Sequence, residues 1–101
     1  MSNPVRGEAP ITIRGQPRLL RPTFDALVQA EEEFGPLFAL VERAAEGQLR
    51  LAEIAALFWH CLAERGDLTR EDVGNAVLAQ GLAASARPLR ILLGEILKGS
   101  G

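Results

Sequence analysis

The sequence predicts a mostly helical α+β fold in which an N-terminal β-hairpin packs on about five short α-helices. Three observations support this class. Apolar residues alternate before a turn near Gly15, as they do in half-buried strands, and a second short segment returns after it. After residue 22, apolar residues recur at helical spacing instead. Threonines and glycines stand at the places where those helical segments should begin and end.

The hairpin is predicted from residues 9–13, which alternate well enough to form a strand, and from residues 17–21, which return. Residues 14–16 supply the turn between them, where a glycine can adopt a positive φ angle. Pro10 and Pro17 cannot donate hydrogen bonds, so both strands should be short or lie at an edge. Because an isolated hairpin is marginal in water, it must lie on the helices or gain strands from another subunit.

The first two helices follow directly. Thr23 is a favourable N-cap for a helix over Phe24–Phe34, and Gly35 ends it. Pro36 suits the first position of the second helix, which Gly47 should stop. The apolar side of the first helix is expected to contain Phe24, Leu27, Val28 and Phe34, and that of the second Leu37, Leu40, Val41 and Ala44.

The third helix, Leu51–Arg65, is predicted to be the centre of the core. Helices that are apolar over most of their circumference are usually buried among others. Only a narrow polar stripe runs along it, formed by Glu53, His60 and Glu64. Phe58 should therefore be a central core residue.

A fourth helix should begin after Thr69, which is a good N-cap, with acidic residues in its first turn, and end at Gly81. The last helix lies between Leu82 and Lys98, where Pro88 either starts it or kinks it. The residues expected to face inward are Val73, Ala76 and Val77 on the fourth helix and Leu89, Leu92, Leu93 and Ile96 on the last.

Length and composition indicate one soluble domain over residues 1–101, with the hairpin in 1–22 and the helical body in 23–98. The hydrophobic content of 48% excludes a disordered chain. A lone cysteine, Cys61, suggests a reducing compartment. The N-terminus lacks an apolar leader, and the longest apolar run, residues 54–59, is too short to cross a bilayer. We therefore expect a cytoplasmic protein without membrane contact.

Charge is distributed unevenly between the two parts of the chain. Residues 1–22 contain four arginines and one glutamate, for a net +3, whereas residues 23–101 contain 7 basic and 12 acidic residues, for −5. Arg14 and Arg18 could therefore dock on the acidic body of another copy or on an acidic partner. Alternatively, they are ordinary edge-strand arginines that keep a small ribbon soluble. Four arginines without interleaved aromatic residues do not indicate nucleic-acid binding.

No constellation of residues suggests catalysis, a metal site or a cofactor. His60 and Cys61 are adjacent, so their side chains leave a helix about 100° apart and cannot act as a base and nucleophile. One histidine and one cysteine also fall short of a zinc site. We expect Cys61 to be a buried hydrophobe, His60 to face solvent and the protein not to be an enzyme.

Three consecutive glutamates cannot converge on one ion, because successive helix positions point in different directions. Glu32 and Glu33 are expected to be solvated. Glu31 projects on the apolar side of its helix, where a carboxylate needs a partner. We expect Glu31 to be at least half buried and paired with an arginine such as Arg43 or Arg87, with a backbone donor, or with a group on another protein.

The sequence resembles the gene transfer agent family of small proteins encoded among the tail genes of phage-like particles. The residues that carry the resemblance are Asn3-Pro4-Val5-Arg6-Gly7-Glu8, the turn at Gly15, Leu20-Arg21, Thr23-Phe24, Ala26-Leu27, Glu31, Phe34-Gly35 and Leu92-Leu93. The likeness covers nearly the whole chain and is strongest over residues 3–35. Pro22 and Asp25 depart from the family pattern at the junction between strand and helix.

The resemblance implies either a tail assembly chaperone or a tail tube protein. Tail tubes are built from β-sheets, so the helical body favours a chaperone that covers the apolar face of the helical tape-measure protein. A structural, tube-associated tail component and a host helical adaptor are the alternatives. The expected partners are the tape-measure protein, other tail proteins or a second copy, in the bacterial cytoplasm or on the particle. The candidate partner-binding residues are Glu31, Leu57, Ile91, Arg14 and Arg18, and Phe38 and Leu97 are further apolar residues expected at the surface.

Overall fold

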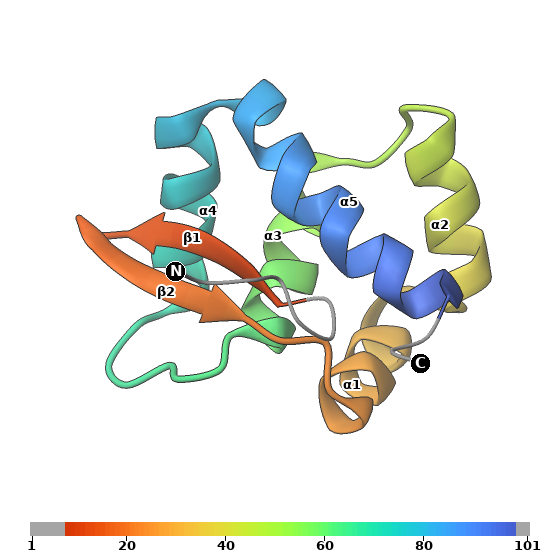
Figure 1. The fold of residues 1–101 in the computed structure, drawn as a ribbon, viewed down its shortest axis with the longest axis horizontal. Coiled ribbons are helices and arrows are strands. Elements are labelled where there is room, and N and C mark those ends of the chain that lie inside the picture. The colour runs from red at the N-terminus through yellow and green to blue at the C-terminus, as the bar shows by residue number, and fades with distance from the viewer. Residues whose placement is uncertain (1–7, 99–101) are drawn as a thin grey trace.

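The computed structural model describes residues 8–98, and side chains as far as Ile96. Within them the predicted class is confirmed, because an antiparallel hairpin is followed by helices (Figure 1). The elements are β1 (Ala9–Ile13), β2 (Gln16–Leu20), α1 (Phe24–Phe34), α2 (Leu37–Ala45), α3 (Leu51–Cys61), α4 (Arg70–Gln80) and α5 (Leu82–Lys98). Arg6, the other residues of the N-terminal motif before Glu8, and the side chain of Leu97 lie outside the described part.

The hairpin turn uses two residues rather than three. Ile13 pairs with Gln16, so Arg14 and Gly15 alone form the loop, with φ angles of 56° and 76°. Two consecutive positive φ angles are typical of the type I′ turn, whose twist matches that of the strands. The second strand therefore begins at Gln16, one residue earlier than predicted.

The outer edge of β2 is covered by the chain that leaves α3. Leu62 forms a β-bridge with Leu20, and on either side the Ala63 N–H donates to the Leu19 carbonyl (3.0 Å) and the Arg21 N–H to the Cys61 carbonyl (2.6 Å). This pairing explains why α3 ends at Cys61 and not at Arg65 as predicted. The backbone groups of these residues bond to a strand instead of continuing the helix.

Both prolines of the hairpin lie at positions where an N–H would not donate a hydrogen bond to the other strand. The Leu19 carbonyl bonds to Ala63, away from β1, so Leu19 and its partner Pro10 form a non-hydrogen-bonded pair. Hydrogen-bonded and non-hydrogen-bonded pairs alternate, and Pro17, two residues before Leu19, occupies the same kind of position. The prediction of edge-like strands is confirmed in this sense.

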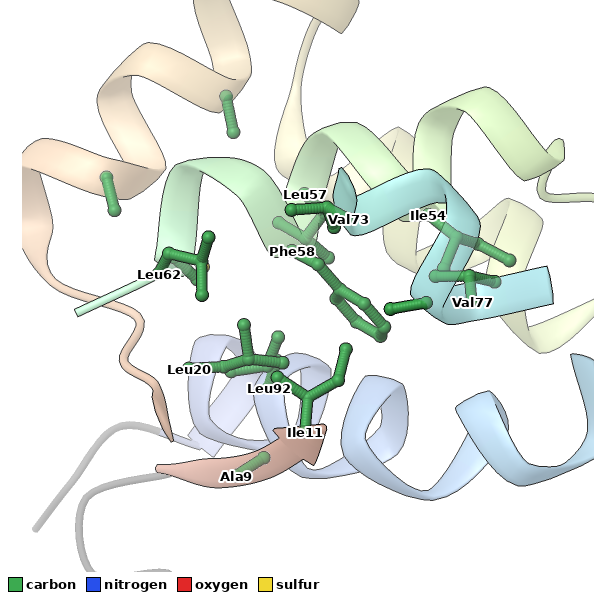
Figure 2. Close-up of a cluster of buried hydrophobic side chains, with 14 of the residues drawn as sticks. Ala9, Ile11, Leu20, Ile54, Leu57, Phe58, Leu62, Val73, Val77 and Leu92 are labelled. Carbon is green, nitrogen blue, oxygen red and sulfur yellow. The ribbon is translucent and has the colours of Figure 1, made fainter. Parts of the chain in front are cut away.

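Helix α3 lies at the centre of the core, as predicted. Six of its eleven residues are buried, and Phe58 is fully buried. Figure 2 shows the Phe58 ring directed from α3 toward Ile11 of β1, beside Val77 of α4. The inward face of β1 alternates strictly, with Ala9, Ile11 and Ile13 buried. The hairpin is therefore stabilised by burying one face against helices, as its short length requires.

The predicted N-caps are confirmed. Thr23 Oγ1 accepts a hydrogen bond from the Ala26 N–H (3.1 Å), and Thr69 and Asp72 form a reciprocal capping box at the start of α4. Pro36 lies one position earlier than predicted, because it is the N-cap of α2 and the helix begins at Leu37. Pro88 is buried within α5, which starts at Leu82, so it does not begin that helix.

The inward face of α1 differs from the prediction. Ala26 and Ala30 are its buried residues, whereas Phe24 is 85% exposed. Leu27 and Phe34 are only partly buried against the core. Small side chains allow α1 to approach α3 closely, and the larger Phe24 at the first position is left outside. The expected apolar stripe is thus rotated toward the alanines.

Phe58→Ala should reduce the free energy of unfolding by about 3–5 kcal/mol, because it leaves a cavity in the centre of the core. Phe38→Ala is the matched control, since Phe38 is 77% exposed and its truncation should change stability by less than about 0.5 kcal/mol. Urea denaturation of both variants measures the difference. Similar losses would mean that Phe58 is not central to the packing.

Candidate functional site

The single cysteine and the carboxylates do not assemble a reactive centre in the described part of the chain. Cys61 is 1% exposed, as predicted, and burial raises the pKa of its thiol to about 12. A thiol with this pKa stays protonated at neutral pH and is a poor nucleophile. Among residues 8–98, no group of three or more histidine, cysteine or acidic side chains could hold a metal ion.

Glu33 joins three helices, which corrects the expectation that it is merely solvated. One carboxylate oxygen accepts a hydrogen bond from His60 Nε2 on α3 (2.8 Å), and the other from Arg70 Nη1 on α4 (2.6 Å). The His60 side chain is only 8% exposed, so the prediction that it faces solvent is wrong. The polar stripe of α3 is covered here by α1 and α4.

The same contacts change the acidity of Glu33. The hydrogen bond from Arg70, and then that from His60, hold the pKa of Glu33 below its ordinary value of 4.5. Because 38% of the Glu33 side chain remains exposed, solvent screens the network and its net energy is modest. Its main effect is to define how α1, α3 and α4 meet.

The expectation that Glu31 is at least half buried is wrong, whereas its predicted pairing with a backbone donor is confirmed. It is exposed, and its carboxylate accepts a hydrogen bond from the Leu37 N–H (3.0 Å). That N–H is one of the unsatisfied donors at the start of α2, so Glu31 caps the next helix in place of an arginine partner. Arg43 pairs with Glu53 instead (2.5 Å).

Contrary to the prediction, Leu57 and Ile91 do not form an exposed apolar surface. Leu57 is 1% exposed and belongs to the core (Figure 2). Helix α3 is surrounded on nearly all sides, so a residue bordering its polar stripe is also buried. Ile91 is partly buried and packs against the core. Leu57 is therefore unavailable to a partner, and Ile91 offers only part of its side chain.

The arginines of the hairpin are partly used within the molecule. Arg14 Nη1 lies 3.7 Å from Asp72 Oδ2 on α4, and Arg21 Nε lies 2.6 Å from Glu8 Oε2. Arg18 shares the inward side of the sheet with Ile11, and its Nε is buried without a hydrogen-bond partner among the described residues. The basic ribbon therefore neutralises some of the acidic body of its own chain, which weakens the prediction of a free basic edge at Arg14.

The apolar surface that remains lies elsewhere. Large apolar side chains that are exposed include Phe24 (85%), Phe38 (77%), Leu78 (59%), Leu82 (58%) and Leu51 (40%). Only Phe38 was expected there. The sequence does distinguish the region of Leu78 and Leu82 from the rest, because residues 73–86 contain no charged side chain, whereas 24% of all residues are charged. Such a segment is typical of a surface that is covered by a partner.

A shallow apolar pocket adjoins this uncharged segment. It has a volume of about 270 Å³ and lies between α2, the start of α3 and the first half of α5. The residues that line it are Ala44, Gly47, Leu49, Ile54, Leu82, Ser85, Ala86 and Leu89. One wall is α2, whose only buried residue is Leu40, so this helix packs less tightly on the rest than α3 does.

The described part of the chain contains no helix long and apolar enough to cross a membrane. Residues 6–99 match a family described as phage tail tube protein, GTA-gp10. The chain belongs to this family. Neither the search of curated proteins nor that of solved structures found a match.

Membership in the GTA-gp10 family confirms the predicted relationship to phage-like gene transfer agent tails. The match spans the hairpin, the helices, and both positions where the sequence departs from the expected pattern, Pro22 and Asp25. It supports a structural role in the tail and makes other tail proteins the natural partners. A family of tail tube proteins agrees better with the tube-associated alternative than with a chaperone.

Glu33→Gln should lower the free energy of unfolding at pH 7 by about 0.5–1 kcal/mol more than Glu32→Gln, because only Glu33 bonds to His60 and Arg70. The folded-state pKa of Glu33 is depressed, so this stabilisation is present above pH 4.5 and is lost as the pH falls through the lower folded value. Urea titrations of both variants at pH 7 and near pH 3 measure it. A difference that persists at the lower pH would contradict an ionic origin.

Proposed function

We propose that this chain is a non-enzymatic structural component of a phage-like tail, associated with the tail tube. The observation that carries the proposal is the match of residues 6–99 to the tail tube family GTA-gp10. The exposed apolar residues support it, because a protein that acts through contacts with other proteins needs surface of this kind. Its partners would be other tail proteins, without nucleic acid or a cofactor.

A second candidate is a chaperone of the tape-measure protein. The observation that favours it is the architecture, since the sheet within residues 8–98 has two strands and helices form most of the chain. A sheet of this size cannot by itself line a channel. A small helical protein can instead cover the apolar face of a long amphipathic helix until the tube forms around it.

The two candidates place the protein differently at the end of assembly. A tube-associated component is made in the bacterial cytoplasm and stays on the finished particle. A chaperone acts in the cytoplasm and leaves. The host adaptor considered from the sequence has no comparable support, because the family match points to tail proteins.

Quantitative mass spectrometry of purified particles tests the proposal. We expect this chain in mature particles at a fixed number of copies per tail, resistant to a high-salt wash. Deleting the gene should remove complete tails, and a copy supplied from a plasmid should restore them. A protein required for tails but missing from washed particles, and bound by a tape-measure fragment, would replace our proposal with the chaperone. Normal tails without the gene would contradict both.

A further inference from the structure

The central helix has an exposed aromatic side chain near one end and the apolar pocket near the other. The neighbours of Phe24, Thr23 and Asp25, line a surface depression together with His60 and Leu62 at the end of α3. The apolar pocket involves Leu49 and Ile54, at the beginning of α3. Ile54 and His60 are six residues apart on α3, so these two sites are separated by about 9 Å along its axis.

The pocket suits a protein side chain better than a cofactor. Its volume of about 270 Å³ is at the lower limit of small-molecule sites, which span ~300–1,000 Å³. Its lining is apolar apart from Ser85, whose hydroxyl already donates to the Gly81 carbonyl and accepts from Gln80. Leu82 is itself exposed, and a second exposed leucine, Leu78, lies four residues earlier near the end of α4. Aromatic side chains are common anchors in apolar pockets at protein interfaces.

We propose that this apolar pocket is occupied by Phe24 of a second copy of the chain. Phe24 is the most exposed of the large apolar side chains described, and it lies at the other end of α3. Charges of both signs lie beside each surface, since Arg21 and Arg65 line the depression next to Phe24 and exposed Glu46 lies between two pocket residues, but one set of positions is complementary. Asp25 follows Phe24 and is exposed, whereas exposed Arg87 and Arg90 directly follow two pocket residues of α5. Opposite charges at the rim of an apolar contact define its orientation.

Contacts of this kind join copies head to tail. The aromatic residue and the pocket are different surfaces of one chain, so seating Phe24 of one copy leaves its own pocket free for a third. Such heterologous contacts add copies in one direction and produce rings or open stacks. The inference deepens the proposed function, since a repeated contact suits a component that recurs in a tail. Its test uses the purified protein alone and is therefore independent of whether particles contain the chain.

Sedimentation velocity over a range of concentrations, from micromolar upward, is the test. The unmodified chain should form species larger than a dimer. Phe24→Ser removes the anchor and Leu82→Glu places a charge at the pocket, and each should raise the dissociation constant at least ~30-fold. Phe38→Ser removes an equally exposed phenylalanine outside the proposed contact and should leave assembly unchanged. Circular dichroism confirms that the variants fold, and Phe24→Ala with Leu78→Glu provides a second, independent pair.

A mixture of the two interface variants gives the sharpest result. Phe24→Ser retains the pocket and Leu82→Glu retains Phe24, so together they have one intact contact. We expect a 1:1 dimer that does not grow, although each variant alone is monomeric. The inference is overturned if the unmodified chain is monomeric throughout or stops at a dimer. It is also overturned if Phe38→Ser weakens assembly as much as Phe24→Ser, or if the mixture remains monomeric.

Discussion

The arrangement of the whole chain depends on the backbone pairing between β2 and the segment that leaves α3. A two-stranded hairpin has little stability of its own, and here Leu62 and the bonds on either side of it attach the hairpin to the end of the central helix. The same pairing brings the start of α1 to that place, because only three residues separate β2 from α1. The position of exposed Phe24 at this end of α3 is thus a consequence of a strand contact far away in the sequence.

The charged residues act mainly between elements of the same chain. Arg14 and Asp72 connect the hairpin to α4, Arg43 and Glu53 connect α2 to α3, and Glu33 connects α1 to both α3 and α4. Each exposed pair contributes little to the free energy of folding. Their consequence for the surface is larger, since charges used inside the molecule do not dominate its contacts with others. The uncharged corner between α4 and α5 is then the most distinctive surface of the described chain.

Local signals in the sequence predicted the elements well, and nonlocal contacts account for the errors. Thr23 and Thr69 identify helix starts because their hydroxyls act within one turn, and the apolar circumference of residues 51–65 identifies the central helix. Periodicity could not show that α3 ends early, because the cause is the bridge from Leu62 to Leu20, which lies 42 positions earlier in the chain. Glu33 and His60 were misjudged for a similar reason, since their neighbours come from other helices. Of the candidate partner residues, Leu57 is buried and Glu31 caps a helix. The absence of charged side chains from residues 73–86 can be seen in the sequence, but an analysis of hydrophobic periodicity does not detect it.

Self-association and binding to another tail protein are compatible on geometric grounds. A standard protein interface takes roughly 800 Å² from each partner, so two head-to-tail contacts would occupy about a quarter of the 6258 Å² surface of this chain. The outward side of the hairpin, with Pro10 and Pro17 exposed, belongs to neither contact. Such contacts would therefore leave the hairpin of each copy free to contact another tail protein. Because the weak contacts of many joined copies bind as one, a small chain without a deep site could hold a long partner. A chaperone and a tube-associated component would then differ in how tightly the copies stay bound to the tail after the tube has formed.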